Sequence, residues 1–140
     1  MNAADADDIY IEGHLSFGNN DASRTELGGV VGYLPWDEIG LGLFSEQHLS
    51  RDLGTTDSSA FRSGLELRWF QEPFEIAGSV GWMLQNMRDG SQSHEITLGV
   101  ESSYLFAITP SVAAMARFNF LFLDEIGALF YYGIGFRILY

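Results

Sequence analysis

The sequence of 140 residues contains no cysteine, no lysine and only three prolines. Without cysteine the chain forms neither a disulfide framework nor a thiolate metal site. Its seven basic residues are all arginines, and nineteen acidic residues bring the net charge to −12. A nucleic-acid partner is therefore not expected, because phosphate binding needs a basic surface. No apolar run approaches the roughly 20 residues of a transmembrane helix, which excludes a helical membrane protein.

The pattern that is present is alternation between apolar and polar residues. In the first segment Ile9, Ile11 and Leu15 alternate with Glu12 and His14. A period of two is typical of β-strands, because successive side chains point to opposite faces. Eight such segments follow one another, at 9–17, 26–33, 38–46, 61–69, 74–85, 95–106, 111–122 and 129–140. The even number of strands favours an antiparallel arrangement that closes on itself.

The connections between these segments also alternate. The three prolines all lie in short connections, at 34–37, 71–73 and 108–110, whereas the other connections are 18–23, 47–58, 86–93 and 123–125. Short turns on one rim and longer loops on the other are typical of transmembrane barrels. We therefore predict an all-β protein, an eight-stranded antiparallel up-and-down transmembrane β-barrel. Residues 9–140 form its single domain, and residues 1–8 form an acidic tail without the basic and apolar regions of a signal peptide.

The two faces of the strands differ in a way that orients the barrel wall. The polar face is rich in glycine, which makes room for large side chains inside a narrow barrel. The apolar face carries aromatic residues near the segment ends, as in the aromatic belts of outer-membrane proteins. These belt residues are Phe17, Tyr33, Trp69, Phe74, Trp82, Tyr104, Phe106, Phe120 and Phe122. The alternative is a soluble, lipocalin-like ligand-binding barrel with the faces inverted.

From Asp8 to Tyr140 the pattern resembles the eight-stranded outer-membrane barrels of the OmpA and OmpX type. The ending resembles the C-terminal assembly signal of that family, with Gly135, Ile138 and Tyr140 at matching positions. The resemblance implies a monomer in the bacterial outer membrane with both termini in the periplasm and no cofactor. Its expected partners are outer-membrane lipids, lipopolysaccharide and the barrel assembly machinery.

The inward face carries charges that must be paired when they leave water. The predicted lumen network consists of Glu12, Arg62, Glu66, Arg68, Glu75, Glu95, Glu101, Arg117 and Arg137. The same face also includes Glu26, Glu38 and Glu46. Counting from the short turns places Glu101 near Arg117 and Glu75 near Arg68, and closure of the barrel places Glu12 near Arg137. Such a network predicts a closed lumen and a structural or surface-interaction role; the alternative is a narrow, gated, cation-preferring pore.

One short motif suggests chemistry. His48 and Ser50, with Glu66 further on, loosely resemble the triad of outer-membrane lipid A deacylases of the PagL family. The sequence departs from that family, because Arg51 follows the serine where the family has asparagine. We therefore expect no enzyme activity. The three histidines show no metal-ligand spacing, so no metal site is predicted.

Overall fold

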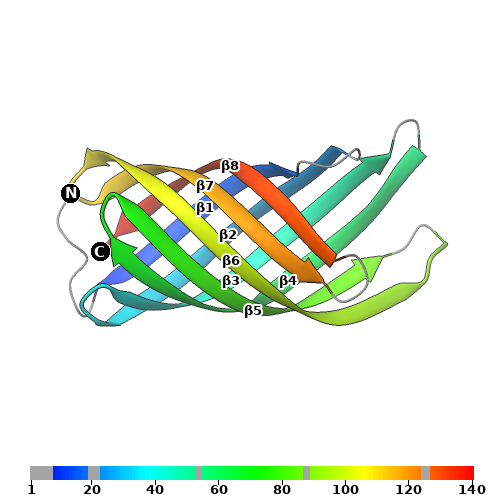
Figure 1. Ribbon diagram of the computed structural model, residues 1–140, viewed down its shortest axis with the longest axis horizontal. Helices are drawn as coiled ribbons and strands as arrows, with labels where there is room; N and C mark the ends of the chain where they lie inside the picture. Colours follow the sequence, from blue (N-terminus) through cyan, green and yellow to red (C-terminus); the bar gives the residue numbers. More distant parts are fainter. Residues whose placement is uncertain (1–7, 19–22, 53–54, 87–88, 124–126) are drawn as a thin grey trace.

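The computed structural model describes residues 8–18, 23–52, 55–86, 89–123 and 127–140, without the side chains of 23, 50–52 and 55–58. Eight strands form a closed barrel in which each strand pairs antiparallel with its neighbours in the chain (Figure 1). They are β1 (Ile9–Gly18), β2 (Ser23–Trp36), β3 (Ile39–Asp52), β4 (Thr55–Gln71), β5 (Phe74–Asn86), β6 (Gln92–Thr109), β7 (Val112–Leu123) and β8 (Gly127–Leu139). The predicted fold class is confirmed. In the described part of the chain, no helix is long and apolar enough to cross a membrane.

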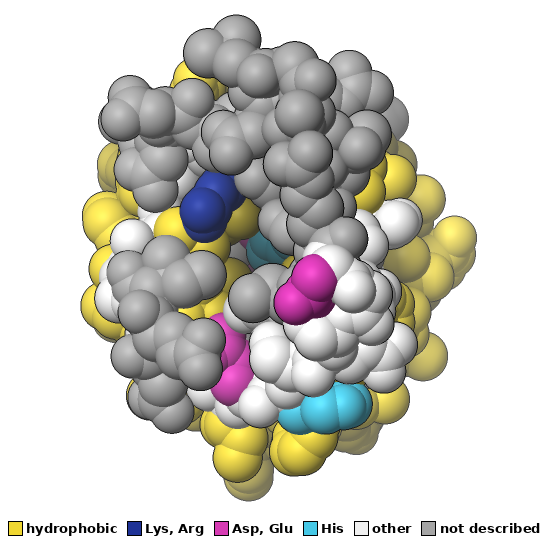
Figure 2. Space-filling view, turned by 90° about the vertical axis from the view of Figure 1, so that its right-hand side faces the viewer, with side chains coloured by type: hydrophobic (Ala, Val, Ile, Leu, Met, Phe, Trp, Pro, Cys, Tyr) yellow, Lys and Arg dark blue, Asp and Glu magenta, His cyan; other side chains and the backbone are white. Residues whose placement is uncertain are grey.

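The period of two sorts the side chains between the outside and the inside of the barrel. Leu43 and Leu65 face each other across β3 and β4, and 65% and 58% of their surfaces are exposed on the outside. The next residue along β3, Phe44, points inward and is only 4% exposed. Viewed from one end, apolar side chains cover the flanks of the barrel (Figure 2). The wall therefore presents an apolar band outward, as a lipid-facing barrel requires.

The barrel closes between its first and last strands. The backbone N–H of Ile9 donates to the carbonyl of Tyr140 at 2.9 Å, and the N–H of Tyr140 donates back at 2.8 Å. This seam leaves no unpaired strand edge, which a lipid environment would not tolerate. It lies at the same end as the short turns between β2 and β3, β4 and β5, and β6 and β7 (Figure 1).

Two details at this end differ from the sequence analysis. Glu38 was expected to point inward, but it lies exposed in the turn between β2 and β3 with a φ of 67°. The reason is that β2 continues to Trp36, so the reversal falls on Asp37 and Glu38. Pro35 lies within β2 and not in a turn, where the register shifts between Tyr33 and Trp36. A residue without an N–H is tolerated at such an irregularity.

The prediction of a loop at 47–58 is wrong, because strands β3 and β4 continue into this stretch. The β3–β4 ladder continues from the pair Gln47 and Phe61 to the pair Asp52 and Thr55, and residues 53–54 lie outside the described part. Inward and outward side chains also continue to alternate here: His48 is buried, and the next residue, Leu49, is 46% exposed. With 14 and 17 residues, β3 and β4 exceed the roughly 9–11 residues that cross a bilayer. The two strands therefore extend past the membrane-spanning part of the wall.

Apolar layers fill both ends of the barrel interior. At the turn end Tyr10, Leu34 and Phe70 pack together with Val30 and Phe44, and a smaller cluster holds Leu105, Ala113 and Met115. At the opposite end the cluster consists of Met83, Leu121, Leu123, Leu129 and Tyr131. The glycine-rich face serves this packing, since a Cβ on Gly32 would overlap the Tyr10 ring. The charged residues lie between these layers.

Candidate functional site: the charged lumen

Arg68 of β4 is the centre of the charged interior. Its guanidinium group lies 3.1 Å from Glu12, 2.9 Å from Glu66, 3.2 Å from Glu75 and 3.1 Å from Glu101. These carboxylates come from β1, β4, β5 and β6, so one side chain links several sectors of the wall. Arg68 is 1% exposed. A buried guanidinium needs several acceptors, and its five N–H donors match this arrangement.

Arg137 of β8 joins the last strand to this centre. It forms ion pairs with Glu75 and with Glu12, the latter at 3.2 Å across the closing seam. The guanidinium carbon of Arg137 also lies 4.9 Å from the centre of the Phe70 ring. Tyr10 donates to Glu66 Oε1 at 3.1 Å, which ties the apolar layer at the turn end to the charges.

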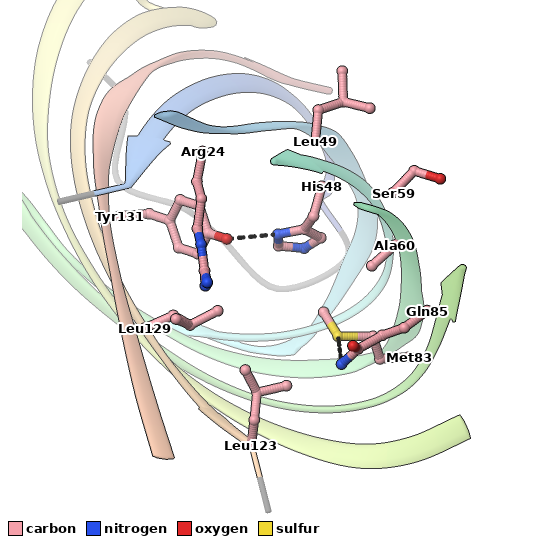
Figure 3. A pocket seen from close by; sticks show the side chains of 10 residues that line it. All are labelled: Arg24, His48, Leu49, Ser59, Ala60, Met83, Gln85, Leu123, Leu129 and Tyr131. Carbon is pink, nitrogen blue, oxygen red and sulfur yellow. Dashed lines mark hydrogen bonds between the residues drawn. The ribbon is translucent and has the colours of Figure 1, made fainter. Parts of the chain in front are cut away.

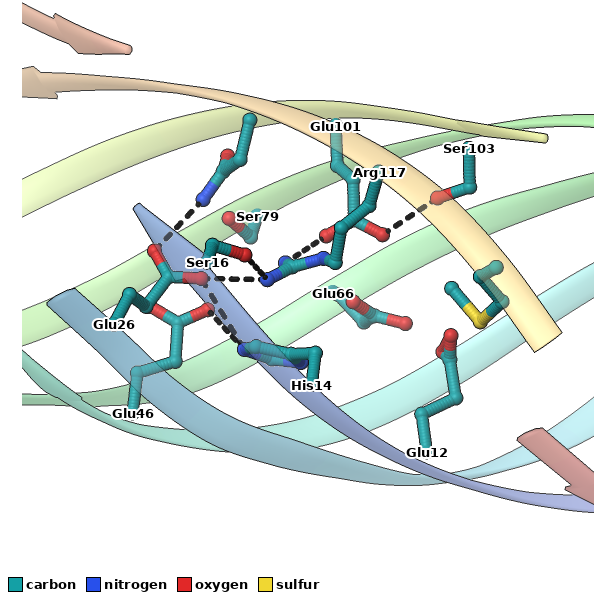
Figure 4. A network of polar contacts seen from close by, with 12 residues as sticks. Glu12, His14, Ser16, Glu26, Glu46, Glu66, Ser79, Glu101, Ser103 and Arg117 are labelled. Atoms are coloured by element: carbon teal, nitrogen blue, oxygen red, sulfur yellow. Dashed lines mark hydrogen bonds and ion pairs between the residues drawn. The ribbon is translucent and has the colours of Figure 1, made fainter. Parts of the chain in front are cut away.

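Arg117 of β7 organises the middle of the lumen (Figure 4). It forms an ion pair with Glu101, and its Nη1 donates to Glu26 at 2.6 Å and to the Ser16 hydroxyl at 2.9 Å. Asn119 donates to the other oxygen of Glu26 at 3.3 Å. Because Glu26 is 0% exposed, these donors replace the water that its carboxylate loses.

Arg62 of β4 holds the remaining buried carboxylate. Its guanidinium group donates to Glu46 at 3.1 Å, to Thr97 at 2.5 Å and to Ser79 at 2.8 Å. It also lies over the Phe44 ring, 4.3 Å from the ring centre. Each buried arginine therefore has at least one carboxylate partner.

Two histidines lie beside Glu26 and Glu46. His14 Nε2 is 3.2 Å from Glu26 Oε1 and 3.9 Å from Glu46 Oε1. His48 Nε2 is 3.2 Å from Glu46 Oε2, and its Nδ1 is 3.2 Å from the Tyr131 hydroxyl. Spacing in the sequence does not connect His14 with Glu26 and Glu46, because these residues come from three strands, although Glu46 and His48 are two residues apart on β3. Inward parity was the one signal that could have done so.

A cavity of about 60 Å³ lies in the end of the barrel away from the short turns (Figure 3). It is lined by Arg24, His48, Leu49, Ser59, Ala60, Met83, Gln85, Leu123, Leu129 and Tyr131. His48 belongs to both the cavity and the charged interior, so it lies where the two regions meet. The space accommodates a few water molecules.

The remaining predicted residues lie either near the mouth of the barrel or in its wall. Glu95 is half-buried and accepts a hydrogen bond from Gln85 at 2.9 Å. The predicted belt residues are all exposed on the outside, at 37% to 63% of their surfaces. Of the three residues matched to an assembly signal, Gly135 lies buried on the inner face of β8, whereas Ile138 and Tyr140 face outward.

The structure does not bring His48 and Glu66 of the deacylase-like motif together. His48 pairs with Ala60, and Glu66 lies six residues further along β4, roughly 20 Å at 3.3 Å per residue. Glu66 is bound to Arg68 and Tyr10, while the carboxylate beside His48 belongs to Glu46. The side chain of Ser50 lies outside the described residues.

One acid outside the barrel wall has a shifted pKa. Asp89, in the connection between β5 and β6, accepts hydrogen bonds from the hydroxyl of Ser91 at 2.5 Å and from its backbone N–H at 2.8 Å. These bonds stabilise the carboxylate and lower the pKa of Asp89 below its usual value, the hydroxyl having the larger effect. The connection is therefore built around an ionised side chain.

A closed barrel of eight antiparallel strands, apolar outside and charged inside, defines an eight-stranded transmembrane-type β-barrel. The comparison with solved structures agrees. The N-terminal β-barrel domain of Pseudomonas aeruginosa OprF matches with a TM-score of 0.65 and 18% identity over 96% of this chain and 98% of that one. Neisserial surface protein A matches with a TM-score of 0.67 and 15% identity over 94% and 95% of the two chains.

The Yersinia pestis outer membrane protein Ail, in a phospholipid bilayer nanodisc, matches with a TM-score of 0.61 and 13% identity over 94% of this chain and 99% of that one. No protein-family model matches the chain, and no curated protein matches its sequence. The chain therefore has the fold of the small outer-membrane β-barrels.

Proposed function

We propose that the protein is a small bacterial outer-membrane barrel with a closed lumen and a structural or surface-interaction role. The observation that carries this proposal is the central arginine network. Arg68 and Arg117 are each 1% exposed, and together with Arg137 they connect carboxylates from opposite parts of the wall. Apolar layers above and below this network add two further barriers to water and ions.

The proposed orientation has both termini in the periplasm. The seam between Ile9 and Tyr140 lies with the short turns, and short turns face the periplasm in outer-membrane barrels. The opposite end, with the extended β3–β4 hairpin, then faces the outside. We expect a monomer that contacts outer-membrane lipids and lipopolysaccharide and that is inserted by the barrel assembly machinery, for which Gly135, Ile138 and Tyr140 are the proposed signal.

The absence of cysteine makes the orientation directly testable. Gln92→Cys at the start of β6 and Glu72→Cys in the β4–β5 turn each introduce one exposed thiol at opposite ends. In intact cells a membrane-impermeant maleimide is expected to label the first variant, and to label the second only after the outer membrane is permeabilised. The reverse result overturns the orientation.

Conductance in planar lipid bilayers tests the closed lumen. Folded protein, verified by its gel mobility, is expected to give no channels across a range of pH and salt, while a general porin in the same bilayers conducts. Regular current steps would overturn the closed lumen.

A second candidate, a narrow cation-preferring pore, is favoured by the excess of buried carboxylates over buried arginines. A pore of this kind gives cation-selective steps in the same recordings. Selectivity for anions, or silence under all conditions, removes it.

A further inference from the structure

Three neighbouring strands bring ligand-type atoms together in the half of the lumen away from the short turns. His14 comes from β1, Glu26 from β2 and Glu46 from β3, and one atom from each lies within 4.8 Å of the other two. The exposed fractions of the three side chains are 4%, 0% and 5%. Figure 4 shows the His14 ring directed at the two carboxylates.

The imidazole nitrogen at the centre of this cluster has no hydrogen-bond partner. His14 Nε2 is buried and lies 3.2 Å from Glu26 Oε1, but the geometry makes no hydrogen bond to it. A buried polar atom without a partner is costly, and such an atom calls for a specific explanation. A buried imidazole nitrogen that lies between two carboxylates has the arrangement of a metal ligand.

The charge balance of the lumen also favours a bound cation. Among the described side chains six glutamates and four arginines are buried, so carboxylates exceed guanidinium groups by two. Arg68 and Arg137 lie among Glu12, Glu66, Glu75 and Glu101, while Arg62 holds Glu46 and Arg117 holds Glu26. The excess therefore belongs to the buried network as a whole, and one divalent cation bound in the lumen would balance it.

We propose that His14, Glu26 and Glu46 bind one divalent transition-metal ion of the zinc type inside the barrel. An imidazole with two carboxylates suits zinc, cobalt or nickel, whereas calcium and magnesium prefer oxygen ligands alone. Zinc–ligand distances of about 2.0–2.2 Å place tetrahedral ligand atoms roughly 3.4 Å apart. The separations of 3.2 Å and 3.9 Å from His14 Nε2 are already close to that value.

The surrounding side chains fit the role of supporting groups. Arg117 and Asn119 hold Glu26, and Arg62 holds Glu46, in the way that hydrogen bonds from outside a metal site orient its carboxylates. A carboxylate has about four lone-pair positions, so these donors leave room for a metal.

The cavity at the loop end lies next to the proposed site. His48 lines that cavity (Figure 3). Its Nε2 lies 3.2 Å from Glu46 Oε2, whereas His14 is nearest to the other oxygen of Glu46. His48 therefore connects the lining of the cavity to one of the three proposed ligands.

The test uses untagged protein, folded in detergent micelles and stripped with a chelator, because a histidine tag would itself bind the probe. Co²⁺ is titrated while visible absorption is recorded, and Zn²⁺ is then added as competitor. The variants are His14→Asn and, as a second ligand change that keeps the side-chain shape, Glu46→Gln. The matched control is His94→Asn, since His94 is exposed on the outside beside Trp82. Gel mobility confirms that every variant is folded.

The proposal predicts one Co²⁺ per chain with a tetrahedral absorption band that Zn²⁺ displaces. Both ligand variants are expected to weaken binding by more than about tenfold, while His94→Asn binds like the original protein. The site is overturned if the folded protein gives no such band. It is equally overturned if the ligand variants and the control bind alike. Neither result bears on whether the lumen conducts.

Discussion

Replacing Arg117 by leucine removes the cation that connects the middle of the lumen. The substitution breaks the ion pair with Glu101 and the contact of 2.6 Å with Glu26. The lumen then holds one more uncompensated negative charge, next to a carboxylate that has no access to water. We expect the barrel to be clearly less stable, because breaking a buried ion pair from one side leaves a charge that is neither solvated nor paired.

The loss of stability in Arg117→Leu depends on the contacts that Glu26 and Glu101 keep in the variant. Glu101 keeps Arg68 at 3.1 Å and the Ser103 hydroxyl at 3.0 Å, whereas Glu26 keeps Asn119 at 3.3 Å and His14 Nε2 at 3.2 Å. Removing one partner of a buried pair costs about 3–5 kcal/mol, and the retained contacts place this case near the lower end. A loss of about 3 kcal/mol changes the folding equilibrium by roughly a factor of 100.

The assay is reversible urea unfolding in lipid vesicles, followed by tryptophan fluorescence and gel mobility. Arg24→Leu is the matched control, because Arg24 is only half-buried at the cavity mouth. Its replacement is expected to lower the free energy of unfolding by about 1 kcal/mol or less. Adding Glu26→Gln to Arg117→Leu should recover part of the loss, since it removes the stranded charge. If Arg117→Leu is as stable as the original protein, or if the added Glu26→Gln destabilises it further, the assumed ionic pairing is wrong.

Three further predictions concern packing, the outer wall and one loop. Gly32→Ala should cost about 1–3 kcal/mol in the same unfolding assay, because its new methyl group meets a buried tyrosine ring of β1, whereas Gly13→Ala has nothing within 4 Å and should be nearly neutral. Leu43→Arg should cost about 2–4 kcal/mol in vesicles, since Leu43 faces lipid. Ser91→Ala should raise the pKa of Asp89, measured by NMR titration, toward its ordinary value.

Each of these predictions has a result that contradicts it. Equal stability of the two glycine variants would mean that Gly32 does not face the packed interior. An undisturbed Leu43→Arg barrel would place that side chain outside the hydrocarbon layer. Because the folded pKa of Asp89 is depressed, its contribution to the loop is present above the unfolded pKa and is lost as the pH falls through the folded pKa. An unchanged titration in Ser91→Ala would show that Ser91 does not hold that carboxylate.

The number of strands and the sidedness of the wall could be predicted from the sequence, because both depend only on the period of two. Leu43, Phe44 and Leu65 lie on the faces that alternation assigns to them. Prediction failed where strands end. Alternation alone does not tell whether a polar stretch such as 47–58 leaves the sheet or continues its ladder beyond the membrane. Glu38 was misassigned for the same reason, because β2 continues to Trp36 and the turn therefore falls on Asp37 and Glu38.

Contacts across the lumen could be predicted only between neighbouring strands. Register alone brings Glu12 opposite Arg137 in β1 and β8. By contrast, the contact of Arg68 with Glu12 crosses the interior, and it depends on the tilt and stagger of the closed barrel, which the sequence pattern does not contain. The cluster of His14 with Glu26 and Glu46 was missed because its residues come from three strands and have no motif-like spacing.

The account depends most on which face of the sheet meets lipid. Gel mobility with and without heating, together with circular dichroism, decides this when it is measured in detergent micelles and in buffer without detergent. The account predicts a compact, fast-migrating β-form that appears only with micelles or lipid, because the outward leucines, valines and aromatics need an apolar solvent. A folded, monodisperse protein in plain buffer would contradict it and would favour a soluble barrel instead.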